Sequence, residues 1–157
     1  MHFIATFSTL CIAGWGGYSS EVIFPGTLVS EYCGEILTRH ASEVRGRIYD
    51  KGGCSFVFNL NNEYDVDAMR KGNKVRYVNC SEKNPNCEAK VMRVNGEDRI
   101  GIYAIKQIRK GEELFFNYGY SEGQKDEFCR FEMINGERKV RSEREIGQAA
   151  RKKAKVD

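Results

Sequence analysis

One dipeptide, Asn95-Gly96, constrains the fold of this chain more than any other feature of its sequence. Asn-Gly favours the tight turn with positive φ angles that joins two antiparallel strands. The dipeptide lies between two runs with the composition of strands, Ala89 to Val94 and Arg99 to Ala104. The sequence therefore predicts a β-hairpin in the middle of the chain, which favours a mainly β fold.

Short apolar runs separated by turn residues extend this pattern along most of the chain. We predict strands at residues 2–12, 27–36, 54–60, 64–68 and 74–78, with turns at 13–18, 61–62, 71–73 and 110–111. Between Arg39 and Tyr49, Ala41, Val44 and Ile48 stand at helical spacing and predict one short helix. The expected fold class is mainly β with short helices.

Composition indicates a single globular domain. The 157 residues are 41% hydrophobic and 30% charged, and a net charge of +3 permits an acidic partner such as chromatin without requiring one. Phe3 to Ala13 is mostly apolar but lacks the basic leader of a signal peptide, so we expect a strand there. No apolar run approaches the roughly 20 residues of a membrane-spanning helix.

The cysteines are too sparse for a disulfide scaffold and have no C-x-x-C spacing. They are Cys11, Cys33, Cys54, Cys80, Cys87 and Cys129. We expect no metal site, and we interpret these residues as reduced thiols of a nuclear or cytosolic protein.

The stretch from Arg76 to Cys87 is unusually rich in side-chain amides, with Asn79, Asn84 and Asn86. An amide offers a donor and an acceptor side by side, which suits an adenine edge or an amino-acid head group. Taken alone, the stretch is better explained as an ordinary surface loop between strands.

The C-terminal segment from Glu137 to Lys155 is charged and mostly basic. We expect a solvated tail, with an exposed helix as the alternative. The basic cluster from Arg151 to Lys155 could alternatively serve nuclear import or contact chromatin.

Four motifs stand in the order and spacing of the SET-domain protein lysine methyltransferases, which the chain resembles. They are Ala13-Gly-Trp-Gly16, Glu31-Tyr-Cys-Gly-Glu35, Arg76-Tyr-Val-Asn79 with Asn84-Pro-Asn-Cys87, and Gly111-Glu-Glu-Leu-Phe-Phe-Asn-Tyr118. Further segments resemble the Enhancer-of-zeste class, the catalytic subunit of a Polycomb repressive complex. These segments are Tyr49–Lys51, Cys54–Asn62, Val66–Lys74, Ala89–Met92, Val94–Gly96 and Arg99–Ile102.

The resemblance implies a SET-domain β-clip fold with a knot-like C-terminal crossing. In this fold the Asn79 loop and the segment from Gly111 to Tyr120 pass each other. We expect the SET domain to occupy residues 1–122 and the basic tail residues 123–157.

The resemblance also implies methyl transfer from S-adenosylmethionine to a lysine amine. The catalytic channel would be walled by Tyr32, Phe58, Tyr118 and Tyr120. The cofactor would be held by Ala13, Gly14, Trp15, Cys54, Ser55, Phe56, Asn79, the backbone of Cys80, and Tyr118. For each aromatic residue alone, ordinary core packing is the competing interpretation.

Three departures from the family pattern matter. Cys80 replaces the usual His of an Asn-His-Ser motif, and one extra residue stands within Ser81 to Asn84. The printed sequence has no counterpart of the cysteine-rich zinc region that precedes the domain in this class. After the domain it has only Cys129, whereas many SET enzymes carry a zinc-binding cysteine cluster there.

We therefore expect a nuclear histone-lysine methyltransferase that acts on a histone H-three tail and represses transcription. Its expected partners are nucleosomes and Polycomb subunits, with weak DNA contact by the tail and no membrane association. The alternative is a catalytically weak SET module that binds chromatin or Polycomb partners. A basic nucleic-acid-binding domain is a third possibility, disfavoured by the modest net charge.

Overall fold

A computed structural model describes residues 3–7, 15–51, 56–119, 131–134 and 137–140. Strands predominate in these ranges, which confirms the mainly β fold class. The strands are β1 (Phe3–Phe7), β2 (Trp15–Ser19), β3 (Leu28–Glu31), β4 (Glu35–Thr38), β5 (Val57–Asn59), β6 (Tyr64–Asp67), β7 (Asn79–Cys80), β8 (Cys87–Val94), β9 (Glu97–Ala104), β10 (Phe115–Phe116), β11 (Phe131–Ile134) and β12 (Glu137–Val140). The helices are α1 (Arg39–Lys51), α2 (Ala68–Lys71) and the 3-10 helix η1 (Lys74–Tyr77).

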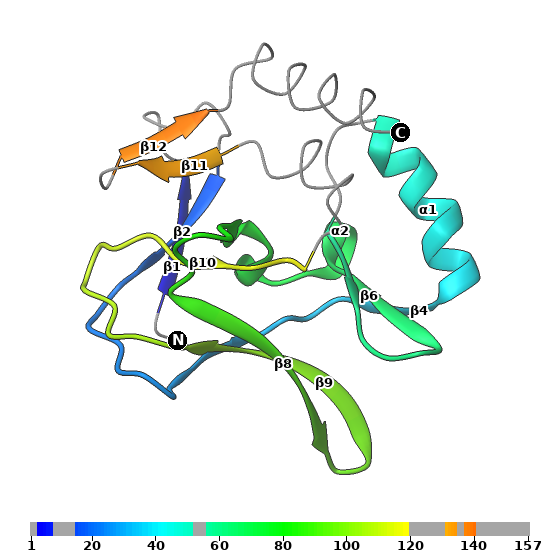
Figure 1. The fold of residues 1–157 in the computed structure, drawn as a ribbon. Coiled ribbons are helices and arrows are strands. Elements are labelled where there is room, and N and C mark those ends of the chain that lie inside the picture. The colour runs from blue at the N-terminus through cyan, green and yellow to red at the C-terminus, as the bar shows by residue number, and fades with distance from the viewer. Residues whose placement is uncertain (1–2, 8–14, 52–55, 120–130, 135–136, 141–157) are drawn as a thin grey trace, which may run out of the picture.

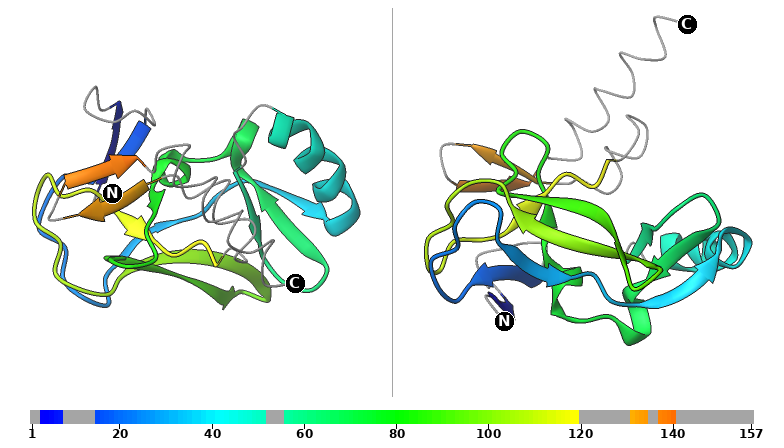
Figure 2. Two further views of the ribbon diagram at one scale, coloured as in Figure 1. Left: turned by 45° about the horizontal axis from the view of Figure 1, so that its top comes forward. Right: turned by 90° about the horizontal axis from the view of Figure 1, so that it is seen from below.

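The strands form small sheets rather than one large one. Two sheets have three strands each, in the orders β3-β9-β8 and β4-β6-β5, and the pairs β1-β2, β10-β7 and β11-β12 are two-stranded. Only β10 and β7 run parallel; the other described pairs are antiparallel. The α1 helix packs beside β4 and β6 at one end, and β1-β2 lies at the other (Figures 1 and 2).

The predicted central hairpin is confirmed. β8 pairs with β9 from Cys87 opposite Ala104 to Val94 opposite Glu97, and Asn95 and Gly96 form the turn with φ angles of 52° and 85°. Asn and Gly tolerate this left-handed region better than other residues. The hairpin projects from the body of the molecule (Figure 1).

Three local predictions were wrong. Residues 27–36 contain β3 and the start of β4, which lie in different sheets, and at the end of β3 the Asn73 amide donates to the Glu31 carbonyl at 2.7 Å. Residues 74–77 form η1 instead of a strand, with Val75 buried and its carbonyl accepting the Val78 N–H at 3.0 Å. Residues 15–18 belong to β2 instead of a turn, because they pair with β1.

The C-terminal prediction was also wrong over residues 137–140. These residues form β12, which pairs with β11 from Phe131 opposite Val140 to Ile134 opposite Glu137. Asn135-Gly136 stands between the two strands in the sequence, the same dipeptide as in the central hairpin. That signal could have predicted this pairing. Residues 141–157, with the basic cluster, lie outside the described ranges.

The hydrophobic core joins the small sheets. Ile100 and Ile102 of β9, Val78, Leu114 and Phe116 are all buried within one cluster. In the described part of the chain, Cys33, Cys80 and Cys87 are not in disulfide bonds. No helix of the described ranges is both long and apolar enough to cross a membrane.

A fully buried carboxylate, Asp67, ties α1 to the centre of the fold. Its oxygens accept hydrogen bonds from Arg45 and Tyr49 of α1, both at 2.8 Å, and from the Met69 N–H at 2.9 Å, which caps α2. Burial alone would raise the pKa of Asp67, but the hydrogen bonds from Arg45, Met69 and Tyr49 hold it below its ordinary value. The charged form of Asp67 therefore stabilises the folded state.

We predict that Asp67→Asn destabilises the protein by about 1–3 kcal/mol, because it removes the charge from a buried hydrogen-bonded group. The pKa of Asp67 in the folded protein lies below its ordinary value of 3.8. The stabilisation is therefore present above pH 3.8 and is lost as the pH falls through the pKa of the folded state.

Urea unfolding at pH 7 and at pH 3 measures the free energy of unfolding of both proteins. The difference between wild type and variant should shrink at pH 3. Glu63→Gln, at an exposed carboxylate, is the control; an equal effect there would contradict the assignment.

Candidate active site

The site is built where two segments distant in sequence pair in parallel. Phe115 and Phe116 of β10 lie opposite Asn79 and Cys80 of β7. The Phe116 carbonyl also accepts the Ser81 N–H at 3.2 Å. This pairing brings the Asn79 loop and the segment after Gly111 together, as predicted. Whether one segment threads the other in a knot-like crossing stays a prediction.

A buried amide, Asn86, joins these two segments. It is 2% exposed. Its Nδ2 donates to the Glu113 carbonyl at 2.7 Å and its Oδ1 accepts the Phe115 N–H at 2.8 Å. The backbone N–H of Asn86 donates to the Phe115 carbonyl at 3.1 Å, and its carbonyl accepts the Ile105 N–H at 3.0 Å. Both ends of the amide and the backbone N–H of Asn86 therefore tie its loop to the segment that contains β10, and the carbonyl of Asn86 ties the loop to Ile105.

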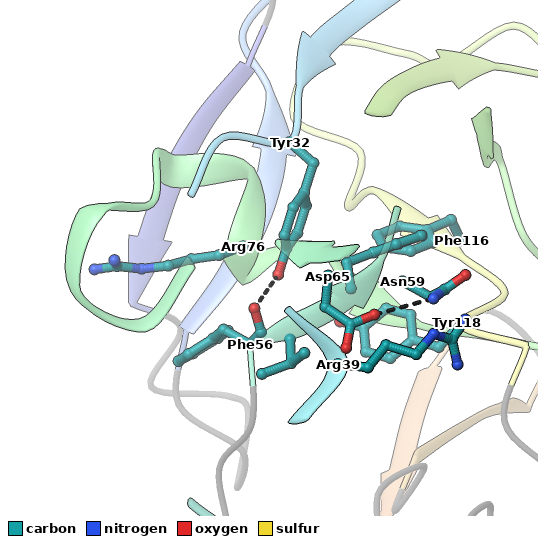
Figure 3. Close-up of a pocket in the computed structure, with 10 residues that line it drawn as sticks. Tyr32, Arg39, Phe56, Asn59, Asp65, Arg76, Phe116 and Tyr118 are labelled. Atoms are coloured by element: carbon teal, nitrogen blue, oxygen red, sulfur yellow. Dashed lines mark hydrogen bonds between the residues drawn. The ribbon is translucent and has the colours of Figure 1, made fainter. Parts of the chain in front are cut away.

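Beside this pairing lies a pocket of about 590 Å³ with aromatic walls. Its aromatic lining residues are Tyr32, Phe56, Phe58, Phe116 and Tyr118. The ring centroids of Tyr32 and Phe58 are 5.2 Å apart, those of Phe58 and Phe116 6.0 Å, and those of Phe116 and Tyr118 4.6 Å. Three of the four predicted channel residues, Tyr32, Phe58 and Tyr118, thus line one pocket. Figure 3 shows Tyr32 and Tyr118 there.

Both tyrosine hydroxyls of the pocket are held by backbone carbonyls. Tyr32 donates to the Phe56 carbonyl at 3.0 Å, and Tyr118 donates to the Val78 carbonyl, 40 residues away in the chain. A ring fixed at its hydroxyl has little rotational freedom. The walls of the pocket are therefore ordered before any ligand enters, which favours tight and oriented binding.

Sequence reasoning missed the other lining residues. They are Arg39, Val57, Asn59, Asp65, Arg76 and Phe116. Phe116 could have been found, because in an extended segment it shares a side with Tyr118, two positions on. The Asp65 carboxylate, which accepts from Asn59 at 3.0 Å, carried no such signal.

A row of aromatic rings leads from the pocket to Trp15. Phe56 lines the pocket and packs edge-on against Tyr77 at 6.0 Å, and Tyr77 stacks on Trp15 at 5.4 Å. The Arg76 guanidinium lies over the Tyr77 ring at 4.8 Å and over the Phe56 ring at 5.7 Å, and it donates to the Ala68 carbonyl at 2.9 Å. This aromatic row connects Trp15 and Phe56, both predicted to hold the cofactor.

Asn79 lies at the Trp15 end of this row. Its Nδ2 donates to the Trp15 carbonyl at 3.3 Å and to Glu113 Oε1 at 2.8 Å. Trp15 is 47% exposed, so the row is open to a ligand. An amide and flat exposed rings suit the polar head group and the adenine of S-adenosylmethionine. The residues present therefore fit the predicted cofactor.

The altered loop after Asn79 keeps its anchors. The Cys80 and Ser81 side chains are buried, and the Asn84 N–H is capped by Ser81 Oγ at 3.2 Å. Residues 82–84 are exposed, and the extra residue expected within Ser81 to Asn84 stays a prediction. At the end of the loop, burial and then the Glu112 charge raise the pKa of the Cys87 thiol to about 12, so Cys87 is a neutral packing residue.

The remaining predicted site residues lie outside the described ranges. These are Tyr120 of the channel and Ala13, Gly14, Cys54 and Ser55 of the cofactor set.

Comparison with known proteins agrees with this geometry. A family model for the SET domain matches residues 14–119. Histone-lysine N-methyltransferase EZA1 of Arabidopsis thaliana is 43% identical over 119 residues, which are 76% of this chain and 14% of that protein. Histone-lysine N-methyltransferase EZ2 of Zea mays is also 43% identical over 119 residues, 76% of this chain and 13% of that protein. The chain thus spans about one seventh of the length of these relatives.

Solved structures of Chaetomium thermophilum Polycomb repressive complex 2 share the fold. The crystal structure of that complex matches with a TM-score of 0.68 and 38% identity, covering 76% of this chain and 15% of that one. The complex in an autoinhibited conformation bound to S-adenosylmethionine matches with a TM-score of 0.67 and 38% identity, covering 74% of this chain and 15% of that one.

We predict that Asn86→Ala destabilises the protein by about 1–3 kcal/mol for each buried group left unpaired. The Phe115 amide should also exchange with deuterium faster, because it loses its acceptor. Thermal unfolding and hydrogen exchange measure the two effects. Asn84→Ala, in the same loop but exposed, is the matched control. If both variants were equally stable, Asn86 would not hold the paired segments together.

Proposed function

This chain belongs to the SET domain family, and on that premise we propose that it transfers a methyl group from S-adenosylmethionine to the side-chain amine of a protein lysine. One observation carries the proposal. Tyr32, Phe58 and Tyr118 line one aromatic pocket. The Tyr118 hydroxyl donates a hydrogen bond to the carbonyl of Val78, the residue before Asn79. The proposed lysine pocket and the proposed cofactor residue therefore meet where β7 pairs with β10.

The pocket suits the chemical requirement that the attacking amine be neutral. With an ordinary lysine pKa of about 10.4, only about one amine in a thousand is neutral at pH 7.4. A pocket walled by aromatic rings disfavours the charged form by desolvation. The same rings pack against the methylene stem of lysine. The walls can therefore both hold the substrate and favour its reactive form.

The tyrosine hydroxyls act as acceptors toward the substrate. Each donates its proton to a backbone carbonyl, Tyr32 to Phe56 and Tyr118 to Val78. A hydroxyl whose proton is committed in this way presents lone pairs to an amine N–H. We infer that these two oxygens orient the amine nitrogen and limit how many methyl groups fit beside it.

The cofactor-binding side would comprise Trp15, Phe56, Asn79, the Cys80 backbone and Tyr118, together with Ala13, Gly14, Cys54 and Ser55. When bound, S-adenosylmethionine supplies a methyl group activated by its positive sulfur. The residues of this chain contribute orientation, which can supply about 7–11 kcal/mol of the barrier when two reactants are held in reacting geometry.

The names of the relatives indicate the substrate and the setting. EZA1 and EZ2 are histone-lysine N-methyltransferases, and the matched structures are of a Polycomb repressive complex. We propose a lysine of the histone H-three tail as substrate, Polycomb subunits as partners, and a nuclear role in chromatin silencing. Residues 1–122 would be the SET domain, and the basic residues of 123–157 would contact nucleosomal DNA weakly.

Transfer of tritium from labelled S-adenosylmethionine to nucleosomes tests this proposal, with and without Polycomb partner subunits. We expect label on histone H-three, with more label when the partners are present. Calorimetry of cofactor binding separates the alternative of a catalytically weak module. Cofactor binding without label in either reaction would favour that module, and absence of binding would overturn the proposal.

We predict that Tyr118→Phe lowers turnover by about a hundredfold while the protein stays folded, because loss of an oriented polar contact at the reacting group has that order of effect. Single-turnover methylation and circular dichroism measure the two properties. Tyr64→Phe, which removes an exposed hydroxyl outside the pocket, is the control. Unchanged turnover in Tyr118→Phe would remove its hydroxyl from the mechanism.

A further inference from the structure

Glu113 lies where three segments of the proposed cofactor side meet. Its Oε1 accepts from Asn79 of β7 at 2.8 Å, and its Oε2 accepts from the Tyr18 hydroxyl of β2 at 3.4 Å. Its backbone forms a bridge with Tyr18, and its carbonyl accepts from Asn86 at 2.7 Å. Glu113 is thus fixed at both its backbone and its side chain.

Space for the carboxylate is left by Gly16 of β2. A Cβ at this position would lie 2.7 Å from Glu113 Oε1, closer than real atoms approach. Absence of a side chain at Gly16 therefore lets the carboxylate reach Asn79. This places a negative charge beside the Trp15 carbonyl, at the open end of the aromatic row.

The contacts of Asn79 settle which way its amide faces. In both contacts Asn79 Nδ2 is the donor, to the Trp15 carbonyl in one and to the Glu113 carboxylate in the other. Neither partner can donate when Glu113 is ionised, so the NH₂ end must face them and the oxygen end must face away. Within the described part of the chain, Asn79 Oδ1 has no hydrogen-bond partner.

We propose that Glu113 is a positioning residue that holds the Asn79 amide with Oδ1 presented as an acceptor to the α-ammonium of S-adenosylmethionine. This inference rests on the proposed function. A carboxylate 2.8 Å from the amide favours a cationic end of the ligand over its carboxylate end. Glu113 acts through Asn79 and through its own charge, without contact to the methyl group being transferred.

Glutamate suits this task better than its amide analogue. A hydrogen bond to an ionised carboxylate is stronger than one between neutral groups. In Glu113→Gln, the new NH₂ could instead donate to Asn79 Oδ1, so the side-chain amide of Asn79 could rotate and exchange the positions of its oxygen and nitrogen. The variant therefore keeps the shape of the side chain and removes only the orientation and the charge.

The test compares calorimetric binding of S-adenosylmethionine and of its analogue lacking the α-amino group. It uses the full chain as wild type, Glu113→Gln, Asn79→Ala and the double variant. We expect Glu113→Gln to weaken binding of S-adenosylmethionine by about tenfold or more. It should change binding of the analogue much less, and it should have a much smaller effect when Asn79 is already Ala. A NMR spectrum of the side-chain amides should show the Asn79 NH₂ shifted in Glu113→Gln before any ligand is added.

Two results would overturn the inference while the proposed function stands: equal weakening for both ligands, or an equal effect of Glu113→Gln with and without Asn79. An unshifted Asn79 amide signal would overturn it independently of any ligand. If the wild type failed to bind S-adenosylmethionine, the proposed function would fall, and the inference with it. Melting temperatures of all four proteins show which of them are folded. If Asn79→Ala or the double variant is unfolded, the amide spectrum of folded Glu113→Gln decides alone.

Discussion

The pairing of β7 with β10 is the constraint on which the rest of the structure depends. Two residues on each side make this ladder, Asn79 with Phe115 and Cys80 with Phe116. So short a ladder is not stable alone, because each backbone hydrogen bond contributes only about 1 kcal/mol net. It persists because the side chains of Leu114 and Phe116 are buried. In addition, the Asn86 side chain hydrogen-bonds to the carbonyl of Glu113 and to the N–H of Phe115. Burial of apolar side chains and one satisfied buried amide therefore set the position of both segments.

The site follows from this arrangement. Val78 precedes β7 and Tyr118 follows β10, and the Val78 carbonyl accepts a hydrogen bond from the Tyr118 hydroxyl. The aromatic pocket forms on that side of the pairing, and Asn79 with Glu113 forms the polar corner next to Trp15. The Asp67 network also supports the site, since Asp67 caps α2, and α2 begins at Ala68, whose N–H donates to the carbonyl of the pocket residue Phe56 at 3.0 Å. A single pairing of two distant segments thus places an aromatic-walled pocket and a polar corner side by side.

The sequence predicted what local chemistry determines. Asn95-Gly96 predicted the central hairpin because its turn needs positive φ angles, and the helical spacing of Ala41, Val44 and Ile48 predicted α1. Local chemistry did not predict η1, because it depends on tertiary contacts: Val75 is buried in the core, and Arg76 reaches back to the Ala68 carbonyl. Asp65 and Glu113 were missed for the same reason, since their roles depend on neighbours distant in the chain. Tyr32, Phe58 and Tyr118 were predicted to form a channel only because the ordered motifs resemble a family.

An NMR titration of the isotope-labelled chain with S-adenosylmethionine tests the proposed site. If β7 and β10 form one cofactor site, backbone signals of Asn79 and Tyr118 shift together with the indole signal of Trp15, with one dissociation constant. Shifts confined to one of the two paired segments would contradict it. So would shifts centred on the separate small pocket around Cys33 and Arg99.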